Sequence, residues 1–326
     1  MLIRSEMIGF GHYLPNKVLT NDDLSKMVET NDEWIVQRTG IKERHICEDG
    51  QYTTDIATIA AKNALKDAKM SVEEVELIIL ATVTPDYFTP SCACVVQKNI
   101  GAENAAAFDI NAACSGFVTA LTIAKQFIES GQYKNILVIG SDALSKATDY
   151  KDRGTCILFG DAAGAAVVKA SDKNSILATE IGAKGADGDK LTSLAYREDG
   201  EETEKRVSKN KSTIWMAGAE VMKFAVKTME KAARKVVEGA GLTFDDIDLV
   251  VPHQANKRII DGALKRLDIG EEKVFINLEK YGNTSSASIP VALCEAIEQK
   301  RAKKGDKIVI VGFGGGLTWG AALLEL

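Results

Sequence analysis

Cys114 is the residue of this 326-residue sequence that best fits a nucleophile. It follows a predicted strand at residues 105–111 and opens a predicted helix, in which apolar side chains recur every three or four residues. The N-terminus of a helix is the positive end of its dipole, so a thiol there is expected to have a lowered pKa and to react as the thiolate. A buried packing thiol is the alternative.

Two further candidates lie where predicted strands end. His253 follows the strand at residues 247–252, in the segment PHQAN, and the carboxyl ends of such strands commonly carry ligand-binding residues. Asn283, in YGNTSS, lies between a strand and a helix. The alternatives are a core histidine with its hydrogen bonds satisfied and a helix N-cap. The glycine-rich segment at residues 313–318 predicts either close backbone approach to a ligand or a tight turn.

An internal repeat indicates how these distant residues can meet. Residues 60–80 align without a gap with residues 232–252, at an offset of 172, and residues 135–140 align with 307–312 at the same offset. The same offset places Cys114 opposite Ser286, next to the Asn283 segment. A duplicated fold with a pseudo-twofold axis therefore predicts that the two turns face one another. Chance similarity between two α/β units is the alternative.

The elements that position these residues alternate between helical periodicity and short Val/Ile/Leu-rich runs, which is typical of strands buried between helices. The pattern predicts an α/β fold of five layers (helix/sheet/helix/sheet/helix), with halves at residues 1–172 and 173–326. Residues 184–212 are expected to form an exposed excursion, and Cys92 and Cys94 to point to opposite faces of a strand. Strands are predicted at residues 77–83, 105–111, 135–140, 162–169, 247–252, 273–277, 307–312 and 319–325.

Composition excludes several classes of protein. With 45% apolar and 26% charged residues the chain is globular, and its net charge of −6 gives no general attraction to nucleic acid or to anionic membranes. No apolar run has the length of a signal peptide or a membrane span, which predicts a soluble cytoplasmic protein. The six cysteines form no C-x-x-C pair, so neither a metal site nor a disulfide scaffold is expected.

Five motifs, in order along essentially the whole chain, resemble the β-ketoacyl-acyl-carrier-protein synthase III family of the thiolase superfamily. They are DINAACSGF around Cys114, GDAAGAAVV at 160–168, PHQAN at His253, YGNTSSASIP at Asn283 and FGGGLTWG at 313–320. The resemblance implies a duplicated thiolase-like fold and a homodimeric acyltransferase. Such an enzyme starts fatty acid synthesis by condensing an acyl-CoA primer with malonyl-acyl-carrier protein. Both are substrates, and no metal or redox cofactor is implied.

The resemblance also implies roles for individual residues. Cys114 is the expected acyl acceptor, His253 and Asn283 are the expected decarboxylation pair, and the backbone N–H groups of Cys114 and Gly315 are the expected oxyanion donors. Trp34 and Arg153 are expected to enclose the adenine, and Asn256 to contact the pantetheine arm. The full set implied for CoA and pantetheine is Trp34, Arg38, Arg153, Gly218, Asn256 and Phe313. Carrier docking is expected at Lys223, Lys257, Arg258, Lys265 and Arg266, for which a solvated charged face is the alternative.

Two departures from the family pattern concern the primer. Thr89 stands where some relatives carry a phenylalanine that bounds the acyl pocket across the dimer interface, and Met222 replaces an aromatic residue near the pantetheine tunnel. Both departures leave the length and branching of the primer open, but not the reaction. The alternative functions are a related condensing enzyme of specialised metabolism, of polyketide or quinolone type, and a non-catalytic acyl-CoA or carrier-binding protein. The apolar residues expected at the dimer interface are Phe88, Cys92, Val95 and Val96.

Overall fold

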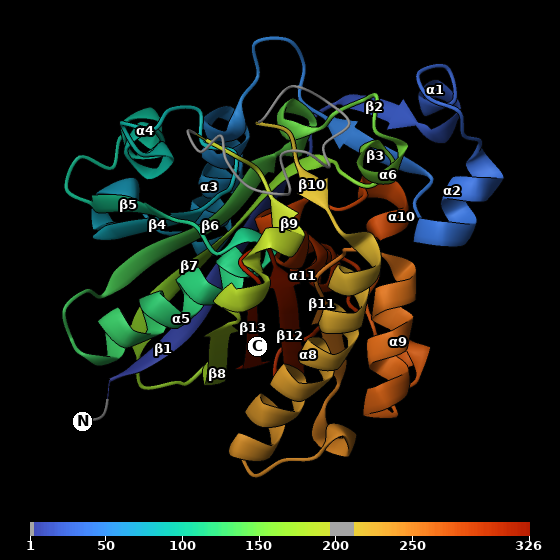
Figure 1. The fold of residues 1–326 in the computed structure, drawn as a ribbon. Helices are drawn as coiled ribbons and strands as arrows, with labels where there is room; N and C mark the ends of the chain where they lie inside the picture. The colour runs from blue at the N-terminus through green and yellow to red at the C-terminus, as the bar shows by residue number, and fades with distance from the viewer. Residues whose placement is uncertain (1–2, 196–211) are drawn as a thin grey trace.

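Two β-sheets form the framework of the structure, a computed structural model that describes residues 3–195 and 212–326 (Figure 1). The first sheet has the strand order β1-β7-β6-β4-β5, and the second has the order β11-β12-β13-β8. Strands β4, β5 and β6 are mutually parallel, as are β11 and β12, whereas the remaining pairs are antiparallel. The strands of the first sheet are β1 (Arg4–Tyr13), β4 (Leu77–Ala81), β5 (Ala106–Ile110), β6 (Asn135–Ala143) and β7 (Asp161–Ser171), and those of the second are β8 (Ile176–Ala183), β11 (Leu249–Pro252), β12 (Lys307–Gly314) and β13 (Thr318–Glu325).

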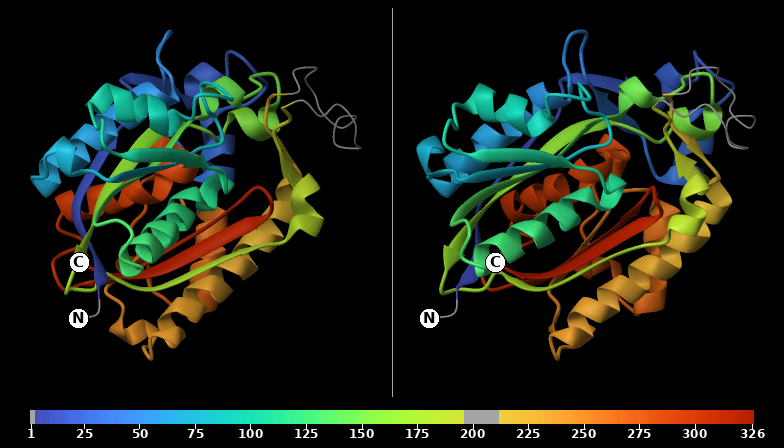
Figure 2. Two further views of the ribbon diagram at one scale, coloured as in Figure 1. Left: turned by 90° about the vertical axis from the view of Figure 1, so that its left-hand side faces the viewer. Right: turned by 60° about the vertical axis from the view of Figure 1, so that its left-hand side comes forward.

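Helices complete five layers, as Figure 2 shows. Helices α3 (Thr53–Ala68) and α4 (Cys92–Ile100) cover the outer side of the first sheet, and α8 (Gly218–Gly239), with α9 (Lys257–Leu267) beside it, covers the second. Helices α5 (Gly116–Glu129) and α11 (Ser288–Glu298) are buried between the sheets. The predicted five-layer α/β fold is thereby confirmed. In the described part of the chain, no helix has both the length and the apolar character that a bilayer span requires.

The 172-residue repeat of the sequence recurs in the elements. Starting points differ by 172 residues for β1 and β8, β4 and β11, β6 and β12, and α5 and α11. The 3-10 turns η2 (Ala113–Ser115) and η7 (Ser285–Ala287) have the same spacing. We propose the boundary between the halves at residues 172/173, in the connection from β7 to β8.

Smaller elements gather where the site residues lie. The hairpin β2 (Lys17–Thr20) and β3 (Glu43–Ile46) lies close to α1 (Asn21–Leu24), α2 (Asp32–Thr39), α6 (Arg153–Cys156) and α10 (Leu278–Tyr281) at the upper right of Figure 1. In the predicted excursion, η4 (Gly185–Lys190) and β9 (Leu191–Thr192) are exposed or half-buried, β9 pairs with β10 (Trp215–Met216), and residues 196–211 lie outside the described residues. The other 3-10 turns are η1 (Val72–Glu74), η3 (Leu144–Ala147), η5 (Phe244–Asp246) and η6 (Glu271–Lys273).

The strand predicted at residues 273–277 is wrong. Val274 makes one isolated parallel bridge to Val250, and the chain then turns into α10. The side-chain Oε1 of Gln254 accepts the hydrogen bond of the Asn277 N–H at 3.0 Å. A side chain therefore takes the place of a neighbouring strand at this point, which periodicity in the sequence does not reveal.

The strand predicted around Cys92 and Cys94 is also wrong, because both residues lie in α4. Ser91 caps this helix, and the Asp109 carboxylate accepts hydrogen bonds from the N–H groups of Cys92 and Ala93, both at 2.7 Å. These contacts satisfy N–H groups that the first turn of a helix leaves without partners. The capping residue Asp109 lies 17 residues downstream of Cys92, beyond the reach of a local pattern.

Candidate active site

Cys114 lies in the tight turn η2 that joins β5 to α5. The α-helix begins at Gly116, two residues later than predicted, because residues 113–115 form a 3-10 turn, in which Ala113 is left-handed with φ +46° and Ser115 has φ −85° and ψ 2°. The half-buried Cys114 side chain lines a cavity of about 1320 Å³, which His253 and Asn283 also line. The structure thus brings together the three residues that the sequence singled out, from η2, the end of β11 and the segment before η7.

The predicted lowering of the thiol pKa is wrong. Burial raises the pKa of Cys114 to about 12, and the nearby Asp142 carboxylate raises it further, while Ser285 and the backbone act in the opposite direction. Loss of solvation therefore outweighs the expected effect of the helix N-terminus. Cys114 is a neutral thiol at physiological pH in this geometry.

His253 is buried, with 1% of its surface exposed. Its Nδ1 lies 2.6 Å from the hydroxyl oxygen of Ser288 at the start of α11, and its ring packs edge-on against Phe313 at 5.5 Å between centroids. The Nε2 atom has no partner among the described residues. Burial lowers the pKa of His253 to about 3, so the imidazole is neutral at physiological pH and carries a single N–H.

Asn283 uses its side-chain oxygen locally. Oδ1 accepts a hydrogen bond from the Ser285 N–H at 2.9 Å, which orients the amide, and Nδ2 makes no hydrogen bond to the described residues. The backbone of Asn283 is paired on both sides with the segment 158–160. The predicted N-cap alternative is thus partly realised, because the oxygen caps the turn while the NH₂ group stays available to a ligand in the cavity.

The glycine-rich segment packs against the turn that carries Cys114. A Cβ atom on Gly314 would lie 2.4 Å from the Cys114 nitrogen, and one on Gly312 would lie 3.3 Å from the His253 Cβ and 3.4 Å from the Cys114 carbonyl oxygen. The Thr318 hydroxyl oxygen lies 2.9 Å from the Ala112 carbonyl oxygen. Gly312 and Gly314 therefore allow β12 to approach the nucleophile closely, and Gly315 lines the same cavity.

Asp142 joins the two halves behind the site. This carboxylate, at the end of β6, is fully buried and accepts hydrogen bonds from the Val83 N–H at 2.7 Å and from the Ser286 N–H and hydroxyl at 3.0 and 2.7 Å. Ser286 is the residue that the repeat places opposite Cys114. Asp142 therefore fixes η7 against the first sheet, and the sequence signal that could have indicated it is an acidic residue at the carboxyl end of a buried strand.

The two residues expected to enclose adenine lie together, and of the two only Trp34 is among the residues that line the cavity. The guanidinium carbons of Arg38 and Arg153 lie 4.1 and 4.8 Å from the centroid of the Trp34 ring. A base inserted between Trp34 and Arg153 needs roughly 7 Å, which is twice a ~3.5 Å contact. Arg153, which also donates a hydrogen bond to the Glu29 carbonyl at 3.0 Å, therefore has to move before a base can enter.

The remaining residues implied for the pantetheine arm line the cavity: Gly218, Asn256 and Phe313, together with the departure Met222. Asn256 caps α9, since its Oδ1 accepts the Arg258 N–H at 2.9 Å, and its Nδ2 donates to the Arg38 carbonyl at 3.1 Å. It thereby joins α9 to α2, although both of its polar groups are already engaged. Thr89 is exposed and is not among the residues that line this cavity.

The basic residues expected at a docking surface fall into two groups. Lys257 pairs with Asp261, and Arg266 pairs with Glu230 at 3.0 Å. Arg258, Lys265 and Lys223 are exposed and make no ion pair with other described residues. Helices α8 and α9 both start at the cavity, which Arg258 lines, whereas Lys265 lies in the last turn of α9.

Comparison with known proteins places these features in a family. Residues 108–185 match the family model of 3-oxoacyl-acyl-carrier-protein (ACP) synthase III, and residues 237–326 match the model of its C-terminal part. The β-ketoacyl-acyl-carrier-protein synthase III of Caldanaerobacter subterraneus subsp. tengcongensis is 53% identical, over 99% of this chain and 98% of that protein. The enzyme of the same name from Clostridium acetobutylicum is 51% identical, over 98% of each.

Solved structures agree with the sequence matches. The 3-oxoacyl-acyl-carrier-protein synthase III of Aquifex aeolicus VF5 superposes with a TM-score of 0.92 at 51% identity, covering 99% of this chain and 100% of that one. A priming β-ketosynthase from the R1128 polyketide pathway has the same TM-score at 35% identity, covering 99% and 96%. On this identity over nearly its whole length, the chain belongs to the β-ketoacyl-acyl-carrier-protein synthase III family of condensing acyltransferases with the thiolase-like fold.

Proposed function

We propose that the chain condenses an acyl-CoA primer with malonyl-acyl-carrier protein through an acyl-Cys114 intermediate, with His253 and Asn283 serving the decarboxylation. The observation that supports these roles is the shared cavity, in which a thiol meets an imidazole Nε2 and an amide Nδ2 that have no partners among the described residues. Two donors and one nucleophile are the groups that a decarboxylating condensation requires.

In the first half-reaction, the Cys114 sulfur attacks the thioester carbonyl of acyl-CoA. A bond forms between the acyl carbon and Sγ, the bond to the CoA sulfur breaks, and the thiol proton ends on the released CoA. The tetrahedral intermediate carries an oxyanion, for which the backbone N–H groups of Cys114 and Gly315 are the proposed donors. Gly315 suits this role because it lines the cavity beside the turn of Cys114.

In the second half-reaction, malonyl thioester loses CO₂ and leaves an enolate. The His253 Nε2–H and the Asn283 Nδ2–H donate hydrogen bonds to the enolate oxygen, and the enolate carbon then attacks the acyl carbonyl and displaces the Cys114 thiolate, which regains a proton. Ser288 is proposed to set the required tautomer of His253 by donating its hydroxyl hydrogen to Nδ1. Its oxygen accepts the Gln254 N–H at 3.4 Å, so its own hydrogen can be donated to Nδ1. Nε2 then carries the ring proton.

The two half-reactions are expected to depend on pH differently. Because burial raises the pKa of Cys114 to about 12, the thiolate fraction grows roughly tenfold per pH unit, and acyl transfer should accelerate between about pH 6 and pH 9. His253, with a pKa of about 3, stays neutral over that range, so malonyl decarboxylation should stay flat. Rapid-quench acylation and CO₂ release measured across one pH series check this, and a flat acylation profile would contradict attack by the free thiolate.

We propose that the carrier protein, which is acidic, docks on the exposed cations of α9. Reversing Arg258 and Lys265 to Glu should raise the KM for malonyl-carrier protein roughly tenfold and alter its salt dependence, while acylation by acyl-CoA changes less, although Arg258 also lines the cavity. The matched control is Lys62→Glu with Lys66→Glu, which makes the same charge change on exposed positions of α3 in the opposite outer layer. Equal KM values for the two double variants would rule out docking at this surface.

We further propose a twofold homodimer built along β5, which is an edge strand of the first sheet. Phe88, 73% exposed, lies in the neighbouring loop, and Val95 is half-buried on α4. Cys92 and Val96, which the sequence assigned to the interface, belong instead to the core between α4 and the sheet. Sedimentation should give twice the 35.1 kDa of one chain, and Phe88→Asp should shift the population toward monomer; an active wild-type monomer would refute the dimer.

The choice of primer distinguishes fatty acid initiation from specialised metabolism. The likeness to a polyketide priming synthase, together with Met222 in the cavity lining, supports the second candidate. A series of acyl-CoA primers of increasing length, condensed with malonyl-carrier protein and read by intact-product mass spectrometry, separates the two. Preference for a short primer with a general fatty acid carrier supports initiation of fatty acid synthesis.

A further inference from the structure

Arg44, in β3, is a buried charge without a carboxylate partner among the described residues. None of its surface is exposed, and its guanidinium donates hydrogen bonds to the carbonyls of Leu19 at 3.1 Å and Ile157 at 2.8 Å and to Asn21 Oδ1 at 2.9 Å. Burial lowers its pKa to about 10, so Arg44 stays charged at physiological pH. An unpaired buried charge costs free energy, and an apolar residue of similar volume would avoid that cost.

The contact with Ile157 leads directly to the backbone of Asn283. The next residues of that segment pair with Asn283 on both sides: the Asn283 N–H donates to the Leu158 carbonyl at 2.8 Å, and the Gly160 N–H donates to the Asn283 carbonyl at 3.0 Å. Arg44 therefore binds the carbonyl of Ile157, the residue directly before the segment 158–160 that pairs with Asn283. A shift of residues 157–160 would carry Asn283 with it.

Close packing leaves little space for such a shift while Arg44 is in place. A Cβ atom on Gly160 would lie 2.2 Å from the Tyr281 carbonyl oxygen and 3.1 Å from the Arg44 Cβ, and one on Gly282 would lie 3.4 Å from the Arg44 Cβ. Gly282 also has φ +64°, which favours glycine. The segments that contain Arg44, Gly160 and Gly282 thus cross in direct contact, and all three meet next to Asn283.

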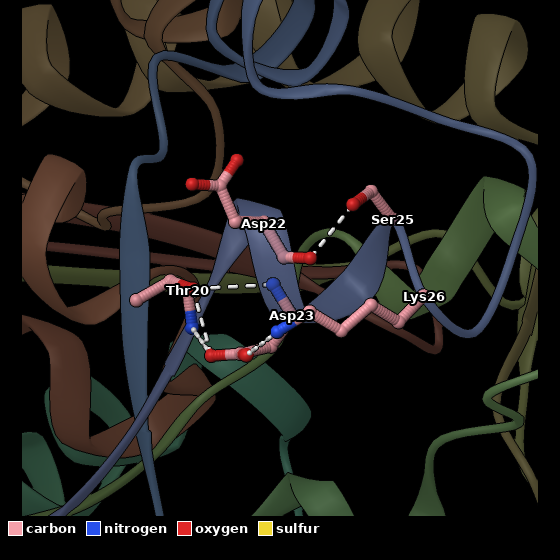
Figure 3. A network of polar contacts seen from close by, with 5 residues as sticks. All are labelled: Thr20, Asp22, Asp23, Ser25 and Lys26. Atoms are coloured by element: carbon pink, nitrogen blue, oxygen red, sulfur yellow. Dashed lines mark hydrogen bonds and ion pairs between the residues drawn. The ribbon is translucent and has the colours of Figure 1, made fainter.

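On its other side Arg44 reaches the helices expected to bind CoA. Asn21 accepts from Arg44 and donates through Nδ2 to Asp32 Oδ1, at the start of the helix that carries Trp34, and to the Ile41 carbonyl, both at 2.8 Å. Asn21 is the first residue of α1, and a reciprocal cap stabilises this helix. Thr20 Oγ1 accepts the Asp23 N–H at 3.2 Å, and the Asp23 carboxylate accepts the Thr20 N–H at 3.2 Å (Figure 3). Residue Ile157 follows α6, which carries Arg153.

We propose that Arg44 is a positioning residue for the decarboxylation step, which fixes the Asn283 amide through residues 157–160 and ties its placement to the helices around Trp34. The inference rests on the role proposed above for Asn283. Arg44 does not touch the cavity, so it acts through the backbone of Asn283 and not on the substrate.

The test is Arg44→Lys, which keeps the positive charge but loses the planar fork that reaches three oxygens at once. Malonyl-pantetheine and acyl-pantetheine are the probes, because neither needs the carrier surface or the adenine site. Decarboxylation of malonyl-pantetheine should fall up to about a hundredfold in kcat, as expected when a catalytic group is displaced by about 1 Å. Acylation of Cys114 by acyl-pantetheine should change by less than about threefold. Equal loss in both half-reactions would indicate general structural damage and overturn the inference.

A double-mutant cycle on the decarboxylation rate distinguishes a positioning role of Arg44 from a purely structural one. In the Asn283→Ala background, Arg44→Lys should change the residual decarboxylation rate by less than about twofold, because the amide that Arg44 positions is already gone. A full additional loss would show that Arg44 acts independently of Asn283. The control is Lys125→Met, which removes a partly buried ion pair with Glu129 on α5 and should leave the ratio of the two half-reactions unchanged.

A milder variant covers the case in which Arg44→Lys does not fold. Asn21→Ala removes one of the three acceptors of Arg44 and should lower decarboxylation in the same direction by a smaller factor. An unchanged ratio of half-reactions in a folded Asn21→Ala or Arg44→Lys protein, judged by circular dichroism, overturns the inference. If Asn283→Ala itself retained full decarboxylation, the proposed role of Asn283 would fail first; normal decarboxylation in Arg44→Lys alone would refute only the role of Arg44.

Discussion

Cys114→Ala is expected to abolish the acyl-enzyme and with it the condensation. Without the sulfur no thioester can form on the protein, so the enolate has no acyl group to attack. Malonyl decarboxylation should persist within about tenfold of its normal rate, because the donors on His253 and Asn283 are untouched. Intact-protein mass spectrometry after incubation with acyl-CoA reads the first effect, and CO₂ release from malonyl-carrier protein reads the second.

The matched control for this prediction is Cys94→Ala. Cys94 is the exposed cysteine of the chain and lies on α4, away from the cavity lining. Its replacement should leave the acyl mass increment and the condensation rate unchanged. If the acyl increment survived in Cys114→Ala and disappeared in Cys94→Ala, the nucleophile would be Cys94 and not Cys114.

His253→Ala is expected to lower malonyl decarboxylation by about 10²–10³-fold. The neutral ring supplies one N–H to the enolate oxygen, and loss of one such donor typically costs this factor, or roughly 3–4 kcal/mol. The substitution also removes the ring that packs against Phe313, so the fold has to be checked alongside the rate. The control is His12→Ala, which replaces a half-buried histidine of β1 that does not line the cavity. It should leave the decarboxylation rate unchanged.

Asn283→Asp tests the second donor with little change in shape. The carboxylate can still accept the Ser285 N–H but cannot donate to an enolate, and its negative charge would repel the oxygen that forms. Decarboxylation should therefore fall at least as far as in Asn283→Ala. Retention of the normal rate in Asn283→Asp would remove Asn283 from the mechanism.

Much of the fold could be predicted because both of its sheets carry buried, aliphatic strands in a duplicated order. Strands β4, β6, β11 and β12 have interiors that are buried on both faces, and this produces continuous apolar runs that the sequence displays. Strands β1 and β8 escaped prediction because β1 alternates buried and half-buried residues, most of β8 is half-buried or exposed, and both include polar side chains. The hairpin of β2 and β3 is too short to show a period.

Cys114 and His253 could be found because each stands at a junction between a strand and a helix, where such sheets concentrate ligand-binding residues, and Asn283 because the repeat places its segment opposite Cys114, although it lies between α10 and η7. The pKa of Cys114 could not be predicted, because it is dominated by burial, which depends on packing between the halves. Ser288 and Arg44 were missed for the same reason. Their contacts span 35 residues to His253 and 113 residues to Ile157, and no local pattern reports such a distance.

The separation of acyl transfer from decarboxylation is the central claim, and acylation of Cys114 in His253→Ala tests it most directly. The variant is incubated with acyl-CoA, its acyl mass increment is followed over time, and CO₂ release from malonyl-carrier protein is measured on the same preparation. The account predicts that Cys114 still takes the acyl group while decarboxylation is lost. Absence of the acyl increment together with preserved decarboxylation would contradict it and would make His253 the general base for the thiol.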